Sequence, residues 1–131
     1  MAQPPSRPLS PHMGIYKWGP AMAVSILHRA TGTALATAGM IGLVWWVLAA
    51  ASGKESYDQF VDWASWWPGK VVMIGLSWAF FQHMCSGLRH FVLDVGAGYE
   101  LKANKIGAIL VVLAAATLTA TLWAYLLLVK G

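Results

Sequence analysis

Residues 71–95 read VVMIGLSWAFFQHMCSGLRHFVLDV, and this stretch decides the fold. Residues 71–88 contain no Asp, Glu, Lys or Arg. A run of about 18 residues without these charged side chains is long enough to cross a lipid bilayer as a helix. Two further runs, 30–51 and 106–129, also lack these residues. The sequence therefore predicts an all-α membrane protein with three transmembrane helices, at about residues 21–51, 70–95 and 104–129.

The composition supports this class. Of the 131 residues 58% are hydrophobic and 11% are charged, about half the charged fraction of a soluble domain. We predict one membrane-anchor domain over residues 1–131, opening with an arm at 1–20 that holds five of the six prolines. In the first loop, 53–68, apolar residues recur at helical spacing, which predicts a short helix in the membrane interface.

Several function classes are excluded by what the sequence lacks. The single cysteine, Cys85, rules out an intrachain disulfide and a Cys-x-x-Cys-His attachment for covalent haem. The basic residues are scattered and not striped along one face, so a nucleic-acid interface is not indicated. No phosphate loop and no nucleophile–base arrangement is present.

The distribution of positive charge predicts the topology. With three spans, six Lys and Arg residues fall on the side of the arm and the second loop, and three fall on the other side. The positive-inside rule therefore places the N-terminus on the cytoplasmic or matrix side of an inner membrane. Ser25, His28 and Arg29 then lie at the same depth as His83, His90 and Asp94.

Three residues of the quoted stretch, His83, Gly87 and His90, share one helix face by their spacing. The missing side chain at Gly87 predicts a slot for a flat macrocycle, with His83 as an axial ligand. His90 cannot be the opposite ligand, since seven residues rise about 10.5 Å and trans nitrogens are about 4 Å apart. That ligand is expected to be His28 or a partner's histidine. Alternatively, His83 forms an interhelical hydrogen bond or a proton relay, and His90 is an interfacial residue.

Ser25 and Arg29 share one face of the first helix. A hydroxyl and a fixed cation could bind a quinone carbonyl oxygen and stabilise negative charge developing on it. Alternatively, Ser25 bonds to its own helix and Arg29 is an anchor at the membrane edge. Asp94 is expected to pair with Arg89 or a loop lysine, or to admit protons at the water boundary.

Three motifs resemble those of the cytochrome b556 anchor family of succinate dehydrogenase. They are Arg7-Pro8-Leu9-Ser10-Pro11-His12-x-x-Ile15-Tyr16, Ser25-Ile26-Leu27-His28-Arg29-x-Thr31-Gly32 and His83-x-x-x-Gly87-x-Arg89-His90-x-x-x-Asp94. The resemblance implies that His83 is an axial ligand of haem b, with the other ligand from a sister anchor subunit. It also implies that His28, Arg29 and His90 lie beside the haem, and that Ser25 and Arg29 belong to the ubiquinone pocket.

The predicted function is therefore that of a membrane anchor in succinate:quinone oxidoreductase (complex II), within electron transport and the tricarboxylic acid cycle. Its expected partners are a second anchor subunit, an iron–sulfur subunit and a flavoprotein subunit. The chain alone is not expected to oxidise succinate. The alternatives are a haem-free structural anchor and a small proton-coupled transporter that uses His83, His90 and Asp94.

Overall fold

The computed structural model describes residue 10 and residues 12–129. Its elements are α1 (Pro20–Ala34), η1 (Leu35–Gly39), α2 (Met40–Ser52), α3 (Lys54–Ser65), α4 (Trp67–Asp94) and α5 (Leu101–Val129). Three helices are long and apolar enough to cross a membrane: Pro20–Ser52, which joins α1, η1 and α2, then Trp67–Asp94 and Leu101–Val129. The predicted all-α class with three transmembrane helices is confirmed. Residues 1–9 and 11 of the predicted arm, with most of the first motif, lie outside the described residues.

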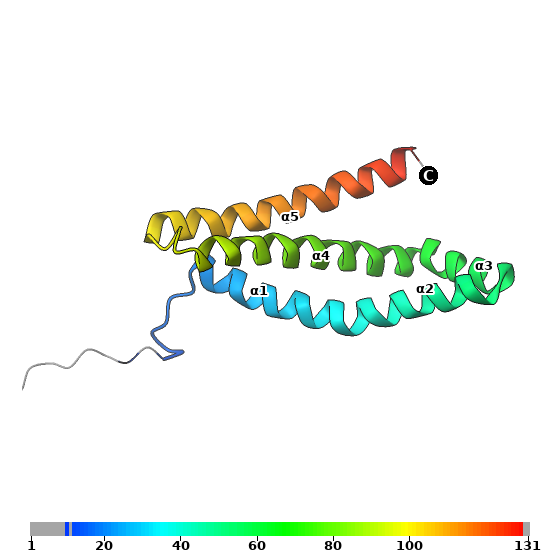
Figure 1. Ribbon diagram of the computed structural model, residues 1–131, viewed down its shortest axis with the longest axis horizontal. Helices are drawn as coiled ribbons and strands as arrows, with labels where there is room; N and C mark the ends of the chain where they lie inside the picture. The colour runs from blue at the N-terminus through cyan, green and yellow to red at the C-terminus, as the bar shows by residue number, and fades with distance from the viewer. Residues whose placement is uncertain (1–9, 11, 130–131) are drawn as a thin grey trace, which may run out of the picture.

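The three long helices lie side by side (Figure 1). α4 is in the middle, with α5 along one side and the α1–α2 helix along the other. The start of α1, the end of α4 and the start of α5 meet at one end of the bundle, and α3 joins α2 to α4 at the opposite end. Residues near 25 and residues near 90 are therefore brought together, as the predicted topology requires.

Prolines and glycines set most helix ends. Pro20 and Pro68 both stand in the first turn of a helix, where a missing N–H costs no hydrogen bond. Gly53 has a φ of 104°, which favours glycine, and separates α2 from the short helix α3. The predicted spans began at 70 and 104, but the helices begin at Trp67 and Leu101. The difference arises because α4 includes Pro68 in its first turn and α5 takes in polar residues assigned to the loop.

The interior of the bundle is built from small side chains. Val24 of α1 packs with Ala108 and Val111 of α5 in the buried core, and Ala79 and Ala115 are also buried. Large apolar residues point outward instead; Ile41 is 70% exposed and Leu113 58%. This distribution is typical of membrane helices, because lipid solvates large apolar groups and small residues let helices approach closely.

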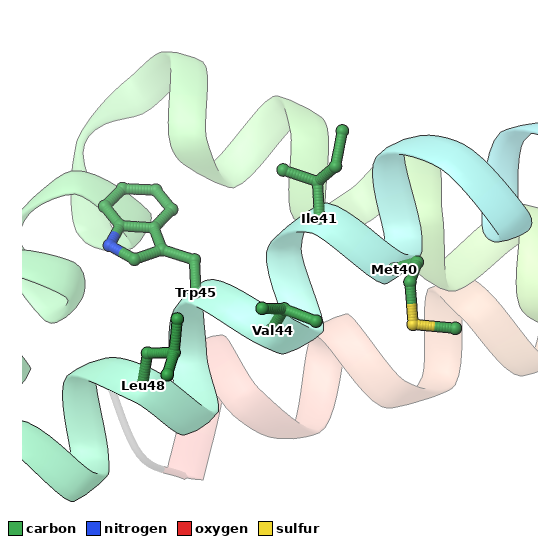
Figure 2. Close-up of a pocket in the computed structure, with 5 residues that line it drawn as sticks. All are labelled: Met40, Ile41, Val44, Trp45 and Leu48. Carbon is green, nitrogen blue, oxygen red and sulfur yellow. The ribbon is translucent and has the colours of Figure 1, made fainter.

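Midway along the first span, η1 is a π-helical turn between two α-helical segments. η1 contacts α4, while α2 beyond it contacts α3. The space between α2, α3 and α4 holds an apolar hollow of about 580 Å³, lined by residues such as Leu43, Trp46 and Val72. A second, open hollow lies on the surface of α2, and Figure 2 shows the five side chains that line it: Met40, Ile41, Val44, Trp45 and Leu48.

Candidate functional site

Three histidines from two helices gather where α1 passes α4. The rings of His28 and His83 are stacked, with centroids 4.0 Å apart and planes 7° from parallel. His90 meets the His28 ring edge-on, at a centroid distance of 4.9 Å. The two clusters that lie more than fifty residues apart in the sequence therefore form one site, as the topology predicted.

The ring of His83 is anchored through one of its two nitrogens. Nδ1 lies 3.0 Å from the backbone carbonyl oxygen of His28 and 3.5 Å from the hydroxyl of Thr31. A carbonyl can only accept, so Nδ1 is the protonated nitrogen and donates to His28. The lone pair is then on Nε2, and a metal-binding histidine commonly has this arrangement, with its other nitrogen bonded to a backbone carbonyl.

His28 lies beside His83 and not across a metal from it. Two axial ligands of one iron place their nitrogens about 4 Å apart on opposite sides of the metal. The His28 and His83 rings instead face each other in parallel at 4.0 Å. This stacked arrangement does not favour His28 as the opposite ligand, and the identity of that ligand, His28 or a histidine of a partner, stays a prediction.

The glycine beside the His83 ring is Gly32, not Gly87. A Cβ built on Gly87 would lie 4.0 Å from Cε1 of His28, so the predicted slot there faces the ring of His28. A Cβ on Gly32 would lie only 2.8 Å from Cε1 of His83. Sequence reasoning gave Gly32 no role; the one available signal is its position one turn after His28.

Ser25 and Arg29 are one turn apart on α1, beside His28, and Ser25 is half-buried. Arg29 is exposed, and its Nε donates to the carbonyl oxygen of Ser25 at 3.4 Å, not to the hydroxyl. Arg29 also lines a hollow of about 410 Å³ between α1 and the arm. The other lining residues are His12, Met13, Tyr16, Trp18, Met22 and Ile26.

Asp94 does not form the expected pair with Arg89. The guanidinium of Arg89 donates instead to the side-chain oxygen of Asn104, which joins α4 to the start of α5. Asp94 is exposed at the last residue of α4, and within residues 12–129 it makes no ion pair with Arg89 or a loop lysine. The expected pairing is wrong because α5 supplies a closer partner for the cation.

Two buried polar residues were missed from the sequence. Gln82 and Ser86 of α4 are fully buried, and their side-chain polar atoms have no hydrogen-bond partner among the described residues. They are four residues apart and therefore share a helix face, one position to the side of His83 and Gly87. A polar i, i+4 pair within an apolar run was the signal that could have identified them.

Known proteins resemble the chain over most of its length. A succinate dehydrogenase cytochrome b556 subunit from Rickettsia felis is 39% identical over 118 residues, 89% of this chain and 90% of the relative. The Paracoccus denitrificans cytochrome b556 subunit is 39% identical over 98 residues, 74% of each chain. The human mitochondrial cytochrome b560 subunit is 34% identical over 111 residues, 82% of this chain and 65% of the relative. The succinate dehydrogenase/fumarate reductase transmembrane subunit family matches residues 3–122, and the chain therefore belongs to that family, as a membrane-anchor component of the enzyme complex.

Proposed function

We propose that this anchor holds one haem b together with a sister anchor subunit and forms part of the ubiquinone-reduction site. The observation that carries the haem assignment is the His83 ring, fixed through Nδ1 on the His28 carbonyl at 3.0 Å, with Nε2 left for a metal. The names of the relatives, cytochrome b556 and cytochrome b560, support a b-type haem.

The residues around His83 fit such a group. His28 Nδ1 is buried and has no hydrogen-bond partner among the described residues, so it is available to a polar group of a bound cofactor. Arg29 and His90, at the same end of the bundle, suit the carboxylates of haem propionates as cationic or hydrogen-bonding partners. When bound, haem b supplies a one-electron redox centre within the membrane. A residue of the sister subunit would supply the second ligand.

For the quinone, the hollow beside α1 combines an apolar wall with a cation. Arg29 lines this hollow of about 410 Å³ with the aromatic rings of Tyr16 and Trp18. A quinone ring packs against such apolar side chains, and the guanidinium stabilises negative charge on the carbonyl oxygen as it is reduced. Ser25 lies one turn before Arg29, where its hydroxyl can donate a hydrogen bond to the same substrate.

The remaining parts of the reaction belong to the partners. A flavoprotein subunit oxidises succinate, and an iron–sulfur subunit delivers electrons to the quinone where it meets Ser25 and Arg29. Asp94, exposed at the last residue of α4, is proposed as a point of proton entry. The complex is placed in a bacterial or mitochondrial inner membrane, with the N-terminus on the cytoplasmic or matrix side.

The test is the reduced-minus-oxidised visible spectrum of the purified complex, with His83→Ala beside the wild type. We expect b-type bands in the wild type and their loss or shift in the variant. Val71→Ala is the control, because Val71 is an exposed residue of the same helix far from His83 and should leave the bands unchanged. Bands that persist in His83→Ala would show that another residue is the haem ligand. The absence of bands in the wild type would show that the anchor binds no haem.

A further inference from the structure

We propose that Gly32 is a positioning residue for His83: its missing side chain sets how closely the imidazole lies against α1 and where Nε2 points. The packing part of this proposal stands on the contact between α1 and α4. The consequence for a bound haem rests on the proposed function.

The contact leaves no room for a side chain. A Cβ on Gly32 would lie 2.8 Å from Cε1 of His83, 3.2 Å from Nδ1 and 3.8 Å from Nε2. Real Cβ atoms essentially never approach another heavy atom to less than 3.0 Å. The ring of His83 therefore lies directly on the backbone of α1 at Gly32.

The ring cannot move aside without losing other contacts. The His28 ring stacks on it at a centroid distance of 4.0 Å. Nδ1 is also bonded to the His28 carbonyl at 3.0 Å and lies 3.5 Å from the Thr31 hydroxyl. His28 and Gly32 are four residues apart, so a single face of α1 provides the stacking ring, the hydrogen-bond acceptor and the open space.

An added methyl group at Gly32 must therefore change the position or orientation of the His83 ring. Either the ring turns, which weakens the bond from Nδ1 to the carbonyl, or α1 and α4 separate. The bond from Nδ1 makes Nε2 a better donor to a metal, so its loss favours the reduced iron and raises the midpoint potential. Helix propensity does not oppose the substitution, because alanine is a better helix former than glycine.

The first experiment measures haem in the whole complex carrying Gly32→Ala. Gly42→Ala in the same continuous helix and Gly75→Ala in the helix of His83 are matched controls, since a Cβ at either position meets open space. We expect the haem-to-protein ratio to fall in Gly32→Ala, and the haem that remains to show a raised potential and altered electron paramagnetic resonance g values. The controls should match the wild type. A Gly32→Ala complex with wild-type haem content, potential and g values would overturn the proposal.

A double-mutant cycle tests the contact with a readout that does not measure haem. Gly32→Ala should lower the thermal unfolding temperature of the complex when His83 is present, and should not lower it in a His83→Ala background, where the clashing ring is gone. If Gly32→Ala prevents assembly, His83→Ala should restore it in the double variant. Equal losses in both backgrounds would overturn the proposal. Failure of haem ligation would appear separately, as b-type bands that survive His83→Ala alone.

Discussion

The imidazole of His83 shows how much one side chain depends on the neighbouring helix. Its Nδ1 donates a hydrogen bond to the His28 carbonyl, and the His28 ring stacks on it. The missing side chain of Gly32 leaves the space that the ring occupies. All three come from α1, while His83 itself belongs to α4. The orientation of the ring is therefore a property of the α1–α4 contact.

Arg29 is the residue on which quinone reduction should depend most. Arg29→Leu removes the cation from the hollow beside α1, and loss of one stabilising group of this kind lowers turnover by about 100-fold. We expect a fall of that order in succinate-driven ubiquinone reduction by the complex. Arg29→Lys should keep part of the activity, because it keeps the charge.

The control for Arg29 separates quinone chemistry from assembly. Lys102→Ala removes an exposed cation from the first turn of α5 and does not touch the hollow, so it should behave as wild type. Succinate oxidation with a water-soluble artificial electron acceptor should be unchanged in Arg29→Leu. Unimpaired ubiquinone reduction by that variant would show that Arg29 serves only as a membrane anchor.

The sequence could predict which residues meet, but not how they meet. His28 and His83 were brought together by the three-span topology and the positive-inside rule alone. Gly32 was missed because the need for a glycine there arises from the His83 ring of the facing helix, and no local sequence pattern shows that contact. The expected pairing of Asp94 with Arg89 was wrong for a similar reason: Arg89 bonds to Asn104, and only the packing of α4 on α5 places these two residues together.

At the level of elements, the π-helical turn η1 is the feature that composition could not reveal. Residues 30–51 read as one uninterrupted apolar helix, yet residues 35–39 adopt wider i→i+5 hydrogen bonding. Such a turn accommodates one residue more than the α-helix needs. Its placement after Gly32 lets α1 keep its histidine face while α2 takes a different direction.

Deletion of Ala36 should therefore be tolerated. The turn has a surplus residue, so its removal allows α-helical bonding to close and leaves the face that carries His28 and Gly32 intact. Deletion of Ala30 is the control. Ala30 lies between His28 and Gly32, so its removal rotates these two residues relative to each other by about 100° around the helix axis. We expect assembled complex with b-type bands from the first deletion and loss of both from the second. Equal damage from the two deletions would show that the π-turn itself is required.

The short helix α3 (Lys54–Ser65) was predicted within the first loop and is confirmed as a helix. Phe60 and Trp63 of α3 pack on Trp45 of α2, each with a ring centroid distance of 5.1 Å. These aromatic contacts fold α3 back on the end of α2. That the helix lies in the interface plane of the membrane stays a prediction.

For the whole molecule, the outward-facing large residues and the small interior explain why the chain needs partners. Buried apolar residues are mainly Ala and Val, while the exposed ones include Leu, Ile and Trp. Lipid can cover part of this surface. The proposed haem site adds a specific need for a second subunit, because within the described bundle the His28 ring is stacked on His83 and His90 meets His28 edge-on, so neither faces His83 from the far side of a haem-sized space.

The orientation of the whole bundle is the last prediction, and it decides which compartment the quinone site faces. Six Lys and Arg residues fall on the side of the arm and second loop, and three on the other, which places both on the cytoplasmic or matrix side. In a Cys85→Ala background, single cysteines at Lys17 and Lys102 should react with an impermeant maleimide only in inside-out vesicles. A cysteine at Glu55, in α3 at the opposite end, should react only in right-side-out vesicles. The reversed pattern would place Ser25 and Arg29 at the outer face, where an iron–sulfur subunit on the inner side could not reach the proposed quinone site.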